Sequence, residues 1–260
     1  MFPKLLDFGG FFLPTYGVLV AAGFLAALWL TGRLAKRSGL DPEKVTNSGV
    51  YAALAGLAGA KLLMFALDFD YYRKNPGEMF SLATLQAGGV FFGGLIFALA
   101  MAFYWIRKQK LPLAATMDSF GPGLALGQAI GRLGCFAAGC CWGASCNRSW
   151  AVEFTNPEAH RLTGVPILEP LHPTQLYEAF LLAAVFATLY WRFGKPHKPG
   201  AIIGLYLVLA SAQRFGVEFF RAHQQANYLN PLSNAQWISL GLAALGASLL
   251  VRGGRTANVG

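Results

Sequence analysis

Charged residues are scarce in this chain. Asp, Glu, Lys and Arg make up only 13% of its 260 residues, whereas a soluble domain carries about 25%. Hydrophobic residues make up 55%, and the mean hydropathy is +0.45. This shortage of charge argues against a soluble globular domain and indicates a protein that is embedded in a membrane.

Negative charge is scarcer than positive charge, with 12 Asp and Glu against 21 Lys and Arg. A net charge of +9 can indicate nucleic-acid binding. Here, however, the basic residues are divided unevenly between the two sides of the membrane. The loops after the first, third, fifth and seventh apolar segments carry roughly twice as many as the loops on the other side, and basic loops favour the cytoplasm. We therefore expect no nucleic-acid partner, an amino terminus outside and a carboxy terminus in the cytoplasm.

Internal repeats are absent from the sequence. No motif recurs every 20–50 residues or so, and the two halves share no inverted pattern of the kind that many transporters show. A small-residue cleavage pattern is also missing after the first apolar segment. We therefore disfavour a transporter, and we expect the first segment to remain as a helix rather than to be removed as a signal peptide.

Apolar segments of about 20 residues, the length that crosses a bilayer as a helix, account for most of the chain. Seven of them run over about 12–31, 46–67, 88–106, 113–136, 173–191, 200–220 and 234–251. The sequence predicts an all-α integral membrane protein with about seven transmembrane helices, forming a single polytopic domain over 1–260. Only 137–172 is long enough for a small external head, between spans 4 and 5.

Two arginines lie within or at the edge of apolar segments, where a charge costs about 2.5–3.5 kcal/mol on insertion scales. Arg214 and Glu218 are spaced i, i+4 and share a helix face, so a purely structural pair stays open. Arg132 has no acidic residue within reach on its own helix, and it follows glycines at 123, 127 and 131. Because guanidinium groups bind planar anions such as phosphate, we predict that Arg132 holds a phospholipid headgroup, with Arg214 as a second cation.

The stretch LHPTQLYEA brings polar side chains to the outer edge of the fifth apolar segment. Its proline is placed to begin a helix. Four polar groups gather around that proline: His172, Gln175, Tyr177 and Glu178. Each alone would be an ordinary residue of a loop or of the membrane interface, but together they favour a role in substrate binding or catalysis.

Cysteines are few, and all four crowd into one stretch: Cys135, Cys140, Cys141 and Cys146. Their spacing, C-x4-C-C-x4-C, lacks the paired C-x2-C that is typical of a structural zinc site, so we expect no metal. An oxidising outer compartment favours disulfides in this stretch. Small buried free thiols stay open as the alternative.

Five segments occur in the order found in one family of membrane enzymes. They are TYG (15–17), AGGVFFGGLI (87–96), GRLGCFAAGCCWG (131–143), HPTQLYEA (172–179) and RFGVEFFR (214–221). With them the chain resembles the bacterial prolipoprotein diacylglyceryl transferases over essentially its whole length. The last two segments together are highly specific, whereas TYG and the glycine pairs alone would be weak.

The resemblance implies an enzyme of the bacterial cytoplasmic (inner) membrane with seven spans. It implies transfer of a diacylglyceryl group from phosphatidylglycerol to the lipobox cysteine thiol of a prelipoprotein, the first step of lipoprotein maturation. The products are a thioether and glycerol 1-phosphate, and no metal or organic cofactor is implied. By the same resemblance Arg132 and Arg214 lie at the headgroup, Glu218 lies beside Arg214, and Tyr16 and Gly143 belong to the active site.

The chain departs from the family pattern at Phe92. Some members carry a histidine at this position, and a phenylalanine cannot accept a proton. Cys135 and Cys140 stand where an Asn and a Glu are frequent, and Ala210 replaces a tyrosine. These changes leave the two arginines and Glu218 untouched.

The general base therefore stays open among His172, Glu218 and Tyr16, and activation of the incoming thiol by the positive field of the arginines alone is a fourth option. The alternative function is that of an inactive paralogue that binds lipid or lipoprotein. A small transporter is a less favoured alternative.

Overall fold

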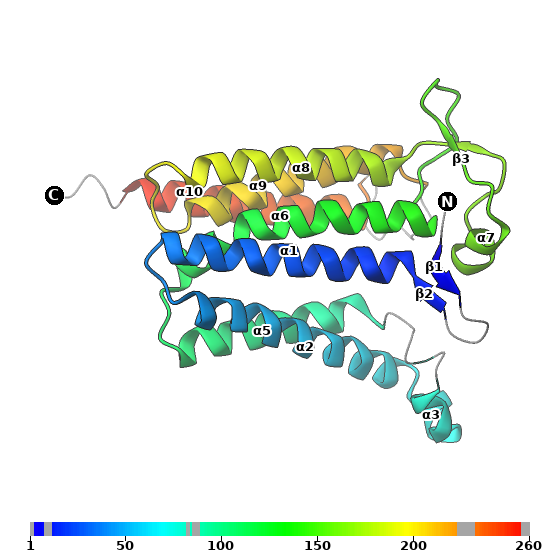
Figure 1. The fold of residues 1–260 in the computed structure, drawn as a ribbon, viewed down its shortest axis with the longest axis horizontal. Helices are drawn as coiled ribbons and strands as arrows, with labels where there is room; N and C mark the ends of the chain where they lie inside the picture. The colour runs from blue at the N-terminus through cyan, green and yellow to red at the C-terminus, as the bar shows by residue number, and fades with distance from the viewer. Residues whose placement is uncertain (1–2, 8–11, 82–83, 85–88, 223–231, 256–260) are drawn as a thin grey trace. The chain divides into compact units, whose positions relative to one another are not determined.

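The computed structural model describes residues 3–7, 12–81, 84, 89–222 and 232–255, with 7 and 252–255 described by their backbone only. Helices dominate the chain, as Figure 1 shows. Within these residues six helical segments are long and apolar enough to cross a membrane. They are α1 (Thr15–Arg37), α2 (Pro42–Leu67), α5 (Phe91–Lys108), α8 (Thr174–Phe193), α9 (Ala201–Val217) with its short extension η2 (Glu218–Phe220), and α10 (Asn234–Arg255).

The helix α6 (Leu113–Ala138) lies where the fourth span is predicted. It has ample length at 26 residues, but by composition it is not among the six candidate membrane spans. Asp118, Gln128 and Arg132 lower its hydropathy, together with several glycines and Pro122.

The chain divides into two compact units, one formed by Met1–Thr31 with Met117–Gly260 and the other by Gly32–Thr116. In the second unit α2 packs against α5 through glycines. A Cβ added at Gly59 would lie 2.7 Å from the carbonyl oxygen of Gly93, and one added at Gly93 would lie 2.4 Å from that of Gly59. Glycine therefore allows these two backbones to approach more closely than any larger residue would permit.

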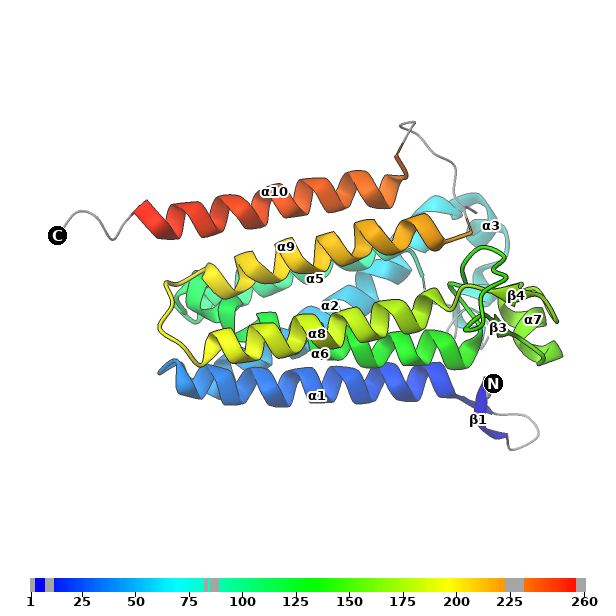
Figure 2. The ribbon, with the colours of Figure 1, turned by 90° about the horizontal axis from the view of Figure 1, so that it is seen from above.

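The first unit contains most of α1 together with α6, α8, α9 and α10 (Figures 1 and 2). Glycines of α6 pack it closely against α1, because a Cβ at Gly123 would lie 2.8 Å from the carbonyl oxygen of Ala27 and one at Gly127 would lie 3.0 Å from that of Gly23. Gly204 of α9 and Gly246 of α10 meet in the same way. These close contacts fix the helices that carry the polar residues described below.

The segment between α6 and α8 forms a small folded region on its own apolar core. Strand β3 (Val152–Glu153) pairs antiparallel with β4 (Pro170–Leu171), and α7 (Pro157–Thr163) lies between them in sequence. The core consists of Trp142, Phe154, Ala159, Val165 and Leu171. A second hairpin, β1 (Lys4–Asp7) with β2 (Phe12–Pro14), precedes α1.

Candidate functional site

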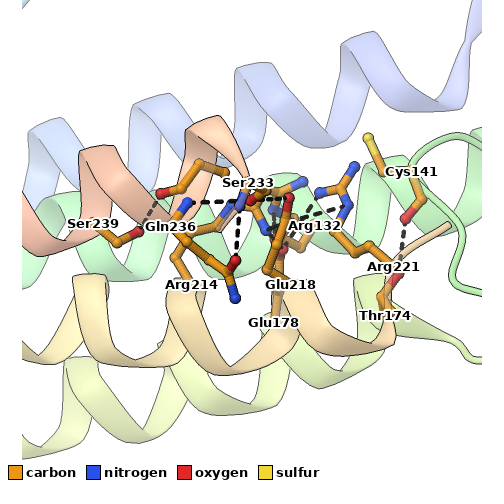
Figure 3. Close-up of polar contacts among 11 residues, drawn as sticks. Arg132, Cys141, Thr174, Glu178, Arg214, Glu218, Arg221, Ser233, Gln236 and Ser239 are labelled. Carbon is orange, nitrogen blue, oxygen red and sulfur yellow. Dashed lines mark hydrogen bonds and ion pairs between the residues drawn. The ribbon is translucent and has the colours of Figure 1, made fainter. Parts of the chain in front are cut away.

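Glu178 in the first turns of α8 is the centre of a group of ionic contacts (Figure 3). Its side chain is only 2% exposed. Oε2 contacts Nε of Arg132 from α6, and Oε1 lies 3.4 Å from Nη1 of Arg214 in α9. Nη1 of Arg221, just after η2, lies 3.6 Å from the same oxygen. One buried carboxylate therefore joins three arginines from three parts of the chain.

Glu218 supplies the second carboxylate. Its Oε2 lies 2.7 Å from Nη1 of Arg214 and 3.9 Å from Nε of Arg221. The hydroxyl of Ser233 donates to Oε1 at 2.8 Å, and the Ser233 backbone N–H donates to the side chain of Gln236 at 2.9 Å. The predicted contact of Arg214 with Glu218 is confirmed, but it belongs to a larger network.

We call Arg132, Arg214, Arg221, Glu178 and Glu218 the arginine cluster. Three cations and two carboxylates leave it with one surplus positive charge. The carboxylates are buried, whereas the arginine side chains remain 21–26% exposed. Oε2 of each carboxylate accepts no well-directed hydrogen bond among the described residues, so the arginine contacts there are electrostatic. Two buried carboxylates surrounded by partly exposed guanidinium groups form a site that is suited to bind one further anion.

Gly143 brings the cysteine-rich loop against the end of α9. Its N–H donates to the His172 carbonyl at 3.0 Å, and it forms an antiparallel bridge with Arg221. A Cβ at this position would lie 2.5 Å from the Phe220 carbonyl oxygen and 2.6 Å from that of His172. Gly143, expected at the active site, therefore sets the backbone position of Arg221.

Gln175 and Thr174 hold the same loop from α8. Gln175 donates to the Cys140 carbonyl at 2.7 Å, and Thr174 donates to the Cys141 carbonyl at 2.8 Å. Both side chains are fully buried. The sequence predicts substrate binding for Gln175, whereas in the structure its amide group positions the loop.

His172 and Tyr177 lie beside a mostly apolar cavity of about 610 Å³. Nδ1 of His172 lies 3.1 Å from the Tyr177 hydroxyl, which accepts a hydrogen bond from Trp150 at 2.8 Å. Phe220 packs edge-on against both rings. The cavity is lined by Trp150, His172, Tyr177, Leu181, Ala212, Gln213, Gly216, Val217 and Phe220. Neighbouring residues of α8 and α9 thus carry both the cavity and the arginine cluster.

Tyr16, at the start of α1, packs near Gly134 of α6, where an added Cβ would lie 3.4 Å from its ring. Its own ring is 45% exposed. Phe92 lies in the first turn of α5, in the other unit, and is also exposed. Lys61 lies within the apolar helix α2. Its ammonium group donates a hydrogen bond to the Thr84 carbonyl.

Arg221 is a member of the site to which the sequence analysis gives no role. The signal is present, because 214, 218 and 221 follow an i, i+4, i+7 pattern that places all three on one helix face. As expected, Arg132 has no carboxylate partner from its own helix among the described residues. Glu178 meets it from a different helix, and Arg132 and Arg214 share this partner.

All four cysteines are free thiols, so the expectation of disulfides is wrong. The alternative of buried free thiols holds for Cys135 and Cys146, whereas Cys140 and Cys141 are half-buried. The sulfur atoms of Cys135, Cys140 and Cys141 lie within 4.8 Å of one another and could hold a metal ion. Hydrogen bonds with the Cys135 and Cys140 thiols lower the pKa of Cys141, and the positive charges of Arg221 and Arg132 lower it further. Cys141 is thus the thiol that favours the anionic form, whereas hydrogen bonds with Cys135 and Cys141 raise the pKa of Cys140.

Comparison with known proteins gives a consistent result over the whole chain. A family model described as prolipoprotein diacylglyceryl transferase matches residues 3–252. A relative from Clostridium tetani is 32% identical over 240 residues, which cover 92% of this chain and 93% of the relative. One from Thermosynechococcus vestitus is 32% identical over 251 residues, which cover 95% and 91%. Both are named phosphatidylglycerol–prolipoprotein diacylglyceryl transferase.

Proposed function

The chain belongs to the prolipoprotein diacylglyceryl transferase family, and from this premise we propose that the arginine cluster is its active site. The substrates are phosphatidylglycerol and a prelipoprotein whose lipobox cysteine accepts the diacylglyceryl group. The observation that carries the proposal is the surplus positive charge of three arginines around two buried carboxylates. That charge balance suits a phosphodiester headgroup, which brings a single negative charge.

The reaction breaks a carbon–oxygen bond and forms a carbon–sulfur bond. The acceptor sulfur attacks the glycerol carbon that bears the phosphate oxygen, and the electron pair of the broken bond stays on that oxygen. Glycerol 1-phosphate leaves with more negative charge than the diester carried. Guanidinium groups fixed around the headgroup stabilise this developing charge without taking or giving a proton.

In this proposal Glu178 and Glu218 hold the arginine side chains in place and take no part in proton transfer. Arg214 contacts both carboxylates and so has little freedom to move. The fixed geometry lowers the reorganisation needed when charge develops on the departing phosphate. Glu218, tied to two arginines and to Ser233, is a poor general base.

The acceptor segment enters through the cavity beside His172. The cavity wall is mostly apolar, with His172, Tyr177 and Gln213 among its polar members, and it therefore suits an apolar segment of the acceptor. His172 assists by orienting the acceptor together with Tyr177, and Tyr16 borders the site from α1. No single side chain is an essential base, because the positive field of the arginines favours the thiolate.

In the membrane, α6 serves as the seventh span beside the six apolar helices. The amino terminus lies outside and the carboxy terminus in the cytoplasm of the bacterial inner membrane, as the distribution of basic loops favours. The folded region within 137–172 is then the external head, on the side where prelipoproteins arrive.

A rescue experiment tests the function. The chain is expressed in bacteria depleted of their own transferase, and radiolabel from phosphatidylglycerol is followed into a model prelipoprotein. Growth and labelling are expected with the parent and not with Arg132→Ala. An inactive lipid-binding paralogue would give neither growth nor labelling with the parent, although the protein reaches the membrane.

A further inference from the structure

Gln213 of α9 brings a hydrogen-bond acceptor without a donor to the cavity beside His172. The residue lines this mostly apolar cavity. Its Oε1 atom is buried and accepts no hydrogen bond among the described residues. A buried carbonyl oxygen without a donor costs free energy, and native proteins leave few of them. Oε1 is therefore placed to accept a hydrogen bond from a molecule that enters the cavity.

His172 offers the complementary group. The Trp150 indole can only donate, so the Tyr177 oxygen accepts its N–H at 2.8 Å. Among the described residues, Nδ1 of His172, 3.1 Å away, is the acceptor for the Tyr177 hydroxyl hydrogen. When Nδ1 accepts, the neutral imidazole carries its hydrogen on Nε2. The cavity thus combines a carbonyl acceptor at Gln213 with an N–H donor at His172.

The cavity and the arginine cluster lie on neighbouring stripes of α9 and η2 (Figure 3). The cluster residues on this segment are Arg214, Glu218 and Arg221. Each directly follows a residue of the cavity wall, and consecutive helical residues point about 100° apart. A chain that lies in the cavity therefore runs beside the cluster and can turn one side chain toward it. The wall residues of this segment are Gln213, Gly216, Val217 and Phe220.

The surroundings of the cavity favour a peptide over an acyl chain as its occupant. Both α8 and α9 are apolar enough to cross a membrane. A peptide that leaves the helical conformation in such surroundings exposes N–H and C=O groups that water does not satisfy. One acceptor and one donor on the cavity wall meet this need, whereas an acyl chain needs neither.

We propose that Gln213 and His172 bind the peptide backbone of the acceptor segment. Oε1 of Gln213 accepts a hydrogen bond from a backbone N–H, and Nε2–H of His172 donates to a backbone carbonyl. These backbone groups recur in every peptide, so the contacts fix the chain whatever its side chains. Both contacts join neutral groups, and the surplus charge of the arginine cluster stays with the headgroup. This inference rests on the proposed function, which places the acceptor in this cavity.

The test uses lipobox peptides in which one backbone N–H at a time is replaced by an ester oxygen. The acceptor cysteine is replaced by serine, so that binding to the full-length protein is measured without transfer. We expect one ester peptide to bind the parent at least about fivefold more weakly than the all-amide peptide, because it lacks the N–H that Gln213 accepts.

Gln213→Met is the matching variant, since methionine is similar in size and lacks the amide. It should bind the all-amide peptide about fivefold more weakly than the parent and no longer distinguish that ester peptide. The control is Gln109→Met, the same substitution at the end of α5 in the other unit, which should bind as the parent does. Equal binding of all ester peptides by the parent, or an ester effect that persists in Gln213→Met, would overturn the proposal.

Two further measurements separate the groups and the ligands. His172→Phe keeps a ring without a donor and should weaken binding of the all-amide peptide about fivefold, and unchanged binding would remove His172 from the site. Gln213→Met should bind phosphatidylglycerol as the parent does. Weaker phosphatidylglycerol binding with unaltered peptide binding would assign the amide to the glycerol hydroxyls of the headgroup and overturn the proposal.

Lipid transfer to the cysteine peptide distinguishes this inference from the function on which it rests. If the parent shows the expected ester effect but transfers no lipid, the proposed function fails and the backbone site stands. If the parent transfers lipid and Gln213→Met binds and transfers equally well, the backbone site fails and the proposed function stands.

Discussion

Arg132 of α6 and the buried carboxylate of Glu178 in α8 form an ion pair between two helices that are distant in sequence. Glu178 is in turn within 3.6 Å of Arg214 and Arg221. The pair therefore connects the two arginines predicted from sequence with a third that the structure adds. Its consequences for the enzyme can be measured residue by residue.

Replacing Arg132 or Arg214 by alanine should lower transfer at least about a hundredfold, the loss typical when one preorganised donor to a developing charge is removed. Arg132→Lys and Arg214→Lys should recover little, because an ammonium lacks the planar fork of a guanidinium. Radiolabelled lipid transfer measures the effect, and the amount of protein extracted from the membrane controls for folding. Near-normal transfer by either alanine variant would remove that arginine from the headgroup site.

Arg221 should be as important as these two arginines, because it contacts both carboxylates. We expect Arg221→Gln to lower transfer by a similar factor. Arg161→Gln is a matched control, since that side chain is 74% exposed and, among the described carboxylates, forms an ion pair with Glu158 alone. Equal activity of the two variants would show that Arg221 has no part in the chemistry.

Gly143→Ala tests whether the position of Arg221 matters. The added Cβ would lie 2.5 Å from a backbone oxygen, so the loop or the end of α9 must shift. Transfer should fall at least about tenfold, because a displaced donor stabilises developing charge less well. Gly241→Ala is the control, since a Cβ there meets no atom within 4 Å. The prediction is wrong if both variants work at the parent rate.

The proposed entry of the acceptor through the cavity is tested by filling it. Ala212→Phe should raise KM for a lipobox peptide several-fold while KM for phosphatidylglycerol stays unchanged. Ala212 lines the cavity, whereas Ala183 of α8 does not, so Ala183→Phe is the control. A rise in KM for the lipid instead would assign the cavity to an acyl chain.

His172→Gln should retain transfer within about tenfold of the parent rate. Glutamine keeps a hydrogen-bonding group near Tyr177, and an acceptor thiol with a pKa of about 8.5 forms more thiolate as the pH rises. The deficit should therefore be largest at low pH and shrink toward pH 9 or so, as shown by rates measured across that range. A variant as inactive as Arg132→Ala at every pH would make His172 the general base.

The sequence predicts the helical membrane fold and most of the site, because apolar length and charges inside apolar segments are local signals. Arg214 and Glu218 could be paired from their spacing alone. The contact of Arg132 with Glu178 could not, since it depends on how α6 and α8 pack. The convergence of Cys140 and Cys141 on Cys135 likewise depends on two left-handed residues and on hydrogen bonds from α8, which no cysteine spacing encodes.

The most direct test of the central claim is the affinity of the arginine cluster for the headgroup phosphate. Equilibrium binding of phosphatidylglycerol and of uncharged diacylglycerol is measured with the parent, Arg132→Gln, Arg221→Gln and the control Arg161→Gln. We predict that Kd for phosphatidylglycerol rises at least about tenfold in the two cluster variants, or roughly 1.4 kcal/mol. Diacylglycerol binding should be unchanged in all four proteins. Unaltered phosphatidylglycerol affinity in both cluster variants, or equal affinity of the parent for the two lipids, would contradict the account.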